Sequence, residues 1–400
     1  MRTVFSGGQV FDGTGSAPAT ADIAVDEGTI AEVGSGLDGD EQVDASGHTI
    51  LPGLFDCHTH IMFSHIDMWK LAQTPFSYMF FEAQANLKRT LSIGITTIRD
   101  AGGADLGVKK AVEDGLVPGP RMQISIKMIS QTGGHGDEWL PSGAYVPFLP
   151  HYPGSPRTIV DGPDEMRRVV RELIRDGADV IKVATTGGVL SPRDDPRHSH
   201  FTPEELEMLV SEAALAGRWV MAHAQGANGI KNAIRAGIRS IDHGVYLDDE
   251  AIDLMLRNGT YLVATLVAPV GVVAAAEQGA QIPEASLQKA KETIEIHKQS
   301  FAKAVDAGVN IAMGTDSGVT PHGENLRELE LMADGGMAPE AVLASTTSKA
   351  AALMGLEKEL GTIEAGKRAD LVLVEGDPFE FAKLADRITA VYKDGRRVIG

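Results

Sequence analysis

Short apolar runs alternate with amphipathic stretches through the middle of this 400-residue chain. The apolar runs predict eight strands, at residues 50–58, 95–100, 121–129, 179–186, 218–224, 239–244, 260–267 and 310–317. Helical patterns lie between most of them, as at 163–176, 203–216 and 227–236, and follow the last, near 324–334 and 338–354. Eight β/α units predict an α/β fold with a TIM-type (β/α)8 barrel. An open doubly wound sheet is the alternative, but no glycine-rich phosphate-binding motif follows the first strand.

The two ends of the chain show a different pattern, in which short runs of alternating apolar and polar residues are separated by glycine-containing turns. Residues 2–13 and 23–30 have hairpin chemistry, and residues 369–376 and 388–398 are strand-like. We expect residues 1–49 and 360–400 to form one small β-sandwich domain, and residues 50–359 to form the barrel. Two independent arms are the alternative, but they would leave sheet edges open.

A long connection, residues 130–160, follows the third predicted strand. Connections of this length in compact domains are either functional or disordered, and the aromatic residues here argue against disorder. Trp139, Tyr145 and Phe148 either form an apolar wall of a binding site or pack the connection onto the barrel.

Composition narrows the class of protein. The formal net charge is −19 and no basic run is present, which argues against nucleic-acid binding. Cys57 is the only cysteine, so no intrachain disulfide can form. The first twelve residues do not resemble a signal peptide, and no apolar run is long enough to span a membrane. We expect a cytoplasmic protein with no membrane partner, although a trimmed secreted form would look the same.

Polar residues gather where the predicted strands end. The first strand ends in His58 and His60, which lie on one face because strand side chains alternate. In a TIM-type barrel the C-terminal strand ends converge on the active site. Imidazoles and a carboxylate converging there predict a metal site, built from His58, His60, His223, His243 and Asp316.

Lys182, on the fourth predicted strand, needs a separate interpretation because an ammonium group cannot ligate a cation. It is either a core lysine paired to a carboxylate or a lysine carboxylated by carbon dioxide. The second form is an anion whose two oxygens can bridge two metal ions.

These residues lie in motifs that resemble the amidohydrolase superfamily. The similarity runs from PGLFDCHTH at 52–60, through GTDSGV at 314–319, to GTIEAGKRADLV at 361–372. The chain resembles the imidazolonepropionase-like group, which includes Xaa-Pro and Xaa-Arg dipeptidases, N-acyl amino acid hydrolases and ochratoxinase. Within that group, Lys182 is similar to the bridging lysine of the two-metal amidases.

The resemblance implies a binuclear enzyme that hydrolyses an amide or peptide bond and releases an amino acid. His58, His60 and Asp316 would bind one ion, His223 and His243 the other, and carboxylated Lys182 would bridge them. Zinc is the expected metal, although cobalt, nickel and manganese accept similar ligands. Asp316 would also carry the proton that the leaving amine requires. Relatives commonly form homo-oligomers, which we also expect here.

Four residues are candidates for contact with a small amide or dipeptide substrate. His135, in the long connection, is similar to a histidine near the substrate carbonyl or carboxylate in the group, or it only orders its turn. Tyr246 could donate its hydroxyl, and Arg193 could hold a carboxylate. Gln225 stands where the group often has histidine, so it cannot supply a positive charge. A cyclic-amide hydrolase and a non-catalytic metal-binding assembly protein are the alternative functions.

Overall fold

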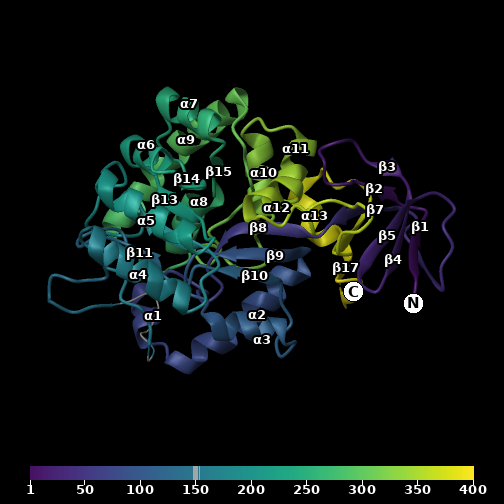
Figure 1. The fold of residues 1–400 in the computed structure, drawn as a ribbon, viewed down its shortest axis with the longest axis horizontal. Coiled ribbons are helices and arrows are strands. Elements are labelled where there is room, and N and C mark those ends of the chain that lie inside the picture. Colours follow the sequence, from purple (N-terminus) through teal and green to yellow (C-terminus); the bar gives the residue numbers. More distant parts are fainter. Residues whose placement is uncertain (147–151, 153) are drawn as a thin grey trace.

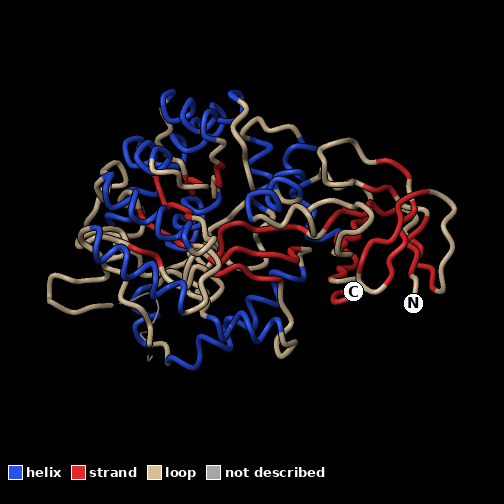
Figure 2. Tube along the Cα trace, viewed as in Figure 1, coloured by secondary structure: helices blue, strands red, loops and turns tan. Residues whose placement is uncertain are grey.

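The computed structural model describes residues 1–146, 152 and 154–400. Parallel strands form its centre in two hydrogen-bonded groups, with helices packed around them (Figures 1 and 2). The three-stranded group has the order β10 (Arg121–Ile124), β9 (Ile95–Asp100) and β8 (Leu54–Thr59). The five-stranded group runs in order through β11 (Met128–Ile129), β12 (Ile181–Ala184), β13 (Val220–Ala224), β14 (Ser240–His243) and β15 (Tyr261–Val263).

Residues 310–317 connect the last of these strands to the first. The Leu262 N–H donates to the Asn310 carbonyl at 2.8 Å, and the Cys57 N–H donates to the Met313 carbonyl at 2.9 Å. The segment therefore pairs with both β15 and β8, which closes the ring of a TIM-type barrel and confirms the predicted fold. We had expected a regular strand here, but the segment is not one. Its end departs from the extended conformation, because Asp316 turns into the left-handed region at φ 61°.

The third predicted strand, 121–129, is interrupted between β10 and β11. The Lys127 N–H donates to the Ser125 carbonyl at 2.8 Å, and Ile126 between them has φ 66°. This hydrogen bond closes a three-residue γ-turn. The pattern of apolar residues could not predict it, because the turn is defined by backbone angles. The turn divides the wall of the barrel into its two groups of strands.

Helices cover the outside of the barrel, and the predicted ones are present with small changes at their ends. The predicted helix 338–354 is two helices. The helices are α1 (Met68–Gln73), α2 (Phe76–Ser92), α3 (Leu106–Glu113), α4 (Pro163–Arg175), α5 (Pro203–Leu215), α6 (Ala227–Arg235), α7 (Asp249–Asn258), α8 (Val267–Glu277), α9 (Glu284–Ala307), α10 (Arg327–Asp334), α11 (Pro339–Ser345), α12 (Ser348–Met354) and α13 (Phe381–Leu384), with a 3₁₀ turn at Ala385–Arg387. In the described part of the chain, none of them is both long and apolar enough to cross a membrane.

The seventh predicted strand, 260–267, is shorter than expected because α8 begins at its end. The buried Glu328 carboxylate of α10 accepts hydrogen bonds from the Leu266 and Val267 N–H groups, both at 2.8 Å. These donors would otherwise lack partners at the start of the helix. A side chain distant in sequence therefore decides where this strand gives way to a helix.

Both chain termini contribute to a small pair of sheets at one end of the molecule (Figure 1). One sheet has the order β5 (Thr29–Gly34), β4 (Asp22–Asp26), β1 (Thr3–Ser6) and β6 (Glu41–Asp44). The other has the order β18 (Arg396–Ile399), β17 (Ile388–Lys393), β16 (Leu371–Glu375), β7 (His48–Pro52), β2 (Gln9–Val10) and β3 (Ala19–Thr20).

Apolar side chains from the two sheets form a common core, which includes Phe5, Ile23, Ile50, Leu371 and Tyr392. The hairpin predicted at 23–30 is present, but the one at 2–13 is wrong. Its two strands, β1 and β2, enter different sheets because each finds its partners elsewhere in the chain.

Gly53 separates β7 of the small sheets from β8 of the barrel, so the predicted strand 50–58 belongs to two sheets. The Gly53 N–H donates to the Asp370 carbonyl at 2.7 Å. A Cβ added here would lie 2.7 Å from the Asp370 Cβ and would collide with the Thr96 hydroxyl. Only glycine therefore allows the chain to pass between these neighbours.

We predict that Gly53→Ala lowers the free energy of unfolding by about 1–3 kcal/mol, because the new methyl group overpacks a closed site. Gly34→Ala is the matched control, since its methyl group would make only an ordinary 3.5 Å contact with Leu37. Urea unfolding monitored by circular dichroism measures both changes. Equal stability of the two variants would contradict the prediction.

Candidate metal centre

The C-terminal ends of the parallel strands surround a cavity of about 180 Å³. Eight of the residues singled out in the sequence line it, and they come from six separate segments of the chain. They are His58, His60, His135, Lys182, His223, Gln225, His243 and Asp316. Side chains that are hundreds of residues apart in sequence therefore meet in one enclosed space.

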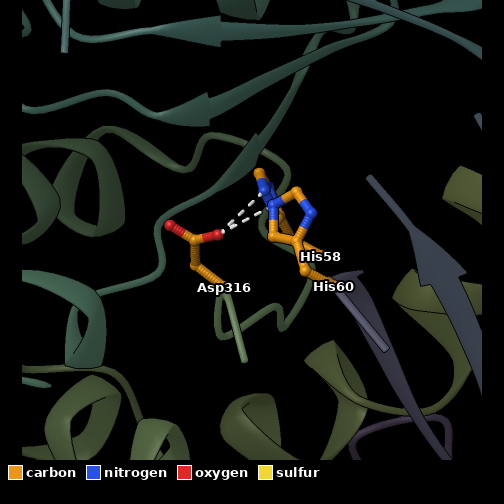
Figure 3. Close-up of side chains that lie close together, drawn as sticks. All are labelled: His58, His60 and Asp316. Atoms are coloured by element: carbon orange, nitrogen blue, oxygen red, sulfur yellow. Dashed lines mark ion pairs between the residues drawn. The ribbon is translucent and has the colours of Figure 1, made fainter. Parts of the chain in front are cut away.

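His58, His60 and Asp316, which line this cavity, form a close group of potential ligands (Figure 3). Asp316 Oδ1 lies 3.1 Å from His60 Nε2 and 3.3 Å from His58 Nε2. One potential ligand atom from each residue lies within 4.8 Å of the others. Two imidazole nitrogens and a carboxylate facing one point have the composition of a divalent metal site.

Each of the four strand-end histidines is held through one ring nitrogen. His58 Nδ1 donates to Asp242 at 2.8 Å, His60 Nδ1 to the Gly102 carbonyl at 2.7 Å, and His223 Nε2 to the Gly187 carbonyl at 3.1 Å. His243 Nδ1 shares a hydrogen bond of 2.7 Å with the Thr265 hydroxyl. Metal-binding histidines are usually fixed in this way, because the bond orients the ring and leaves the second nitrogen for the ion. These residues therefore fit a metal centre.

Lys182 lies within the same group of side chains. Its Nζ is 3.4 Å from His58 Nε2 and 3.4 Å from the Asp242 carboxylate. The side chain is buried, and burial lowers the pKa of the ammonium group while Asp242 partly opposes this effect. Lys182 lies next to a carboxylate, as a paired core lysine would, and it also faces the cavity, as a carboxylated lysine would. Both interpretations from the sequence are therefore compatible with its position.

Comparisons with known proteins identify the family of the chain. Residues 49–398 match the Amidohydrolase family. The chain belongs to the amidohydrolase family. It is 34% identical to ochratoxinase of Aspergillus niger over 423 aligned positions, which cover 98% of this chain and 86% of that protein. It is 25% identical to imidazolonepropionase of Caldanaerobacter subterraneus subsp. tengcongensis, over 90% of this chain and 85% of that protein.

Among solved structures, this amidohydrolase is similar to a Xaa-Pro dipeptidase with methionine bound in the active site. The two superpose with a TM-score of 0.91 at 35% identity, and the match covers 100% of both chains. The family and its relatives make this chain an enzyme that hydrolyses amide or peptide bonds.

Two of the predicted ligands of the amidohydrolase have unusual backbone conformations. His243 has φ 79° and Asp316 has φ 61°, in the left-handed region that few residues other than glycine adopt, although asparagine, aspartate and histidine adopt it more often than most. His297 Nε2 on α9 donates a hydrogen bond of 2.8 Å to the His243 carbonyl, which helps to hold the backbone of His243 in this conformation. Strain of this kind persists only where the surrounding structure enforces it, and it is concentrated at functional sites.

Burial and neighbouring charge set the protonation of these groups. Burial lowers the pKa of His223 and His243 well below its usual range, so both are neutral at pH 7. Burial alone would lower the pKa of His60, but the bond and charge of Asp316 outweigh it and raise the pKa. Neutral imidazole is the form that binds a metal ion, so two of the four histidines are already in the binding form.

His135 of the long connection reaches the cavity through contacts with residues 188–194. Its ring stacks on His223 with centroids 4.2 Å apart. Its Nδ1 donates to the Ser191 hydroxyl at 2.6 Å, and that hydroxyl donates to the Asp194 carboxylate. Burial raises the pKa of Asp194, but hydrogen bonding and charge from His135 outweigh it and hold the pKa at about 2.

The other predicted substrate contacts differ in position. Gln225 lines the cavity, is buried, and its Oε1 has no hydrogen-bond partner among the described residues. Tyr246 and Arg193 are not among the lining residues. Tyr246 lies near the charges of Arg197 and Asp195, and the Arg193 guanidinium lies 5.2 Å from the Trp139 ring.

The aromatic wall, one of the two alternatives for the long connection, is absent among the described residues that line the cavity. Trp139 and Tyr145 are exposed instead, while Phe148 lies outside the described residues. Aliphatic residues take this place, among them Ile66, Val189, Val272 and Val319.

Several residues of the site were missed in the sequence. Asp242 and Arg99 are fully buried, and Arg99 Nη2 lies 3.2 Å from the Asp242 carboxylate. Asp242 directly precedes His243 at a strand end, which was the available signal. No comparable signal marked Thr265, Lys127 and Glu138, because threonines and charged loop residues are common throughout protein sequences.

We predict that Thr265→Val weakens zinc binding about tenfold or more, because it removes the oxygen that orients His243 while keeping the shape of the side chain. Thr90→Val is the matched control, since the buried Thr90 hydroxyl has no hydrogen-bond partner in the described part of the chain. Competition with a chelating dye measures both affinities. If the two variants bind zinc equally well, Thr265 does not support the ligand.

We also predict a pH effect of His297 on the stability of the metal-free protein. Burial lowers the pKa of His297 to about 4 from an ordinary 6.5. As the pH falls, His297 is therefore protonated in the unfolded chain at a higher pH than in the folded protein. Between these values stability falls as pH is lowered, by up to about 1.4 kcal/mol per pH unit. His297→Gln keeps an N–H donor but cannot titrate, so its urea midpoint should fall less between pH 6.5 and 4.5. Parallel pH profiles would exclude this role.

Proposed function

We propose that this amidohydrolase is a binuclear metal-dependent enzyme that hydrolyses the amide bond of a dipeptide or N-acyl amino acid and releases an amino acid. The observation that carries the proposal is the arrangement of the four histidines. Each is tied by one nitrogen and presents the other towards a cavity that also contains Asp316 and Lys182.

The residues divide into two groups of ligands. His58, His60 and Asp316 would hold one ion, and His223 and His243 the other. Lys182 would bridge them after reacting with carbon dioxide, a step in which the neutral amine forms an N–C bond and releases a proton. The buried position that lowers the Lys182 pKa favours this neutral amine. Bound divalent ions, with zinc the best match to these ligands, would supply a nucleophilic water near neutral pH and polarise the scissile carbonyl.

Asp316 would move the proton. Its pKa is held well below the ordinary value, because the charges and hydrogen bonds of His58 and His60 outweigh the effect of burial. A carboxylate ionised at pH 7 can accept the proton of the attacking water and deliver it to the nitrogen of the leaving amine. That delivery is required because an unprotonated amine is a poor leaving group.

His135 and Gln225 would position the substrate. Because Ser191 holds His135 Nδ1, His135 Nε2 is the nitrogen available to the substrate carbonyl. The buried Gln225 Oε1 is an acceptor that lacks a donor, and an N–H group of the substrate would satisfy it. The aliphatic wall favours an apolar group on one side of the scissile bond. The similarity to ochratoxinase and to a Xaa-Pro dipeptidase supports the same class of substrate.

Metal analysis together with a substrate panel tests this function. We expect about two ions per chain and hydrolysis of at least one substrate among Xaa-Pro dipeptides, Xaa-Arg dipeptides and N-acyl-phenylalanine. Asp316→Asn should retain much of the metal but lose about 10²- to 10⁴-fold in kcat, because it cannot accept the proton.

One ion per chain with activity on a cyclic amide would favour an imidazolonepropionase-like reaction instead. No bound metal and no hydrolysis would favour the non-catalytic alternative. Near-normal turnover of Asp316→Asn would remove Asp316 from its proposed role.

A further inference from the structure

A second lysine faces the cavity but is not part of the metal centre. Lys127 lines the cavity and is partly buried. Among the described residues its ammonium group forms no hydrogen bond and no ion pair. Apart from Lys182, it is the one cationic side chain among the lining residues that the structure describes. Glu138 acts on it through charge alone, and a partly buried positive charge with no hydrogen bond or ion pair to a described residue is costly.

The backbone that carries Lys127 is strained. Ile126 has φ 66°, which is rare for a β-branched residue, and the γ-turn that it occupies is an unfavourable kind of turn. Two main-chain hydrogen bonds hold it, from Lys127 N–H to the Ser125 carbonyl and from Gly103 N–H to the Ile126 carbonyl at 2.9 Å. Backbone strain is concentrated at functional sites, so the strain beside this cavity suggests that the position of the Lys127 side chain matters for function.

The turn lies close to the metal centre. A Cβ added to Gly102 would lie 3.8 Å from the His60 ring and 3.8 Å from the Met128 backbone nitrogen. The segment that carries Lys127 therefore runs beside His60, and Gly102 separates the two. A lysine side chain that starts here has the reach to meet a substrate whose amide lies over His60.

The rest of the cavity indicates the chemistry of the partner. One wall is aliphatic, with Ile66, Val189 and Val272 in contact in a common cluster. The lining residues outside the predicted metal ligands include only two charged side chains in the described structure, Lys127 and Glu138. A ligand with an anionic group facing Lys127 and an apolar group facing the aliphatic wall would match two of these features.

We propose that Lys127 binds the free carboxylate of the amino acid that is released, and so selects substrates with a free carboxylate over their amides. The inference rests on the proposed function, since it needs an amide bond cleaved next to that amino acid. Burial lowers the pKa of Lys127, and an arriving carboxylate would offset the cost of that burial. The contact would be a hydrogen bond between charged groups, which is stronger than one between neutral groups.

A different role for Lys127 would be to balance the charge of Glu138, which acts on it electrostatically. In that case Lys127 would maintain the long connection and would not discriminate between substrates. The two roles differ in one measurable respect, because only carboxylate binding depends on whether the substrate is an acid or an amide.

The experiment compares the best substrate of the panel with its C-terminal carboxamide. Lys127→Met keeps the length of the side chain but removes the charge. It should lower kcat/KM for the free acid roughly tenfold to a hundredfold and leave kcat/KM for the carboxamide nearly unchanged. Lys127→Arg should restore much of the preference. Glu138→Gln is the matched control and should keep the preference for the acid.

A binding measurement separates this inference from the proposed function. Calorimetry with N-acetyl-L-phenylalanine and N-acetyl-L-phenylalaninamide should show tighter binding of the acid by the wild-type protein, and Lys127→Met should abolish that difference. This result would support Lys127 even if no hydrolysis were found. Equal effects of Lys127→Met on acid and amide, or wild-type protein that does not prefer the acid, would overturn the inference.

Discussion

The buried carboxylate of Asp242 is the interaction on which the site depends. It accepts a hydrogen bond from His58 Nδ1 at 2.8 Å, lies 3.2 Å from Arg99 Nη2 and lies 3.4 Å from Lys182 Nζ. Burial would raise the pKa of this group, but the charges of Arg99, Lys182 and His58 outweigh that effect and keep it ionised. Because a buried charge is tolerated only with partners, each member of this cluster fixes the positions of the others. Strands β8, β9, β12 and β14 are thereby joined at one point.

The ends of the strands convert that rigid cluster into a reactive site. His243 and Asp316 leave their strands in left-handed conformations, which turn their side chains into the cavity and not along the barrel wall. Hydrogen bonds hold both conformations, since His297 Nε2 of α9 donates to the His243 carbonyl and the Asp316 N–H donates to the His58 carbonyl of β8 at 2.7 Å. The stability of the barrel therefore offsets the strain at the site.

Sequence patterns predicted the parts of this protein that repeat. The apolar runs revealed the barrel, and residues such as His58 and His60 were found because strand ends converge. Patterns failed where a distant group decides the local structure. Glu328 caps α8, β1 and β2 enter different sheets, and Ile126 interrupts a strand through backbone geometry alone. Asp242 and Lys127 were missed for a related reason, since their importance comes from neighbours that are distant in the chain.

The γ-turn at Ile126 has a consequence for how such enzymes diversify. Its hydrogen bonds are made by main-chain atoms, so they place few demands on the side chain at position 127. If Lys127 selects the substrate as inferred above, a change of residue there would alter which compounds are accepted while the proposed metal ligands, built on neighbouring strands, stay in place. Chemistry and selectivity would then lie on separate pieces of backbone, so that one could vary without disturbing the other.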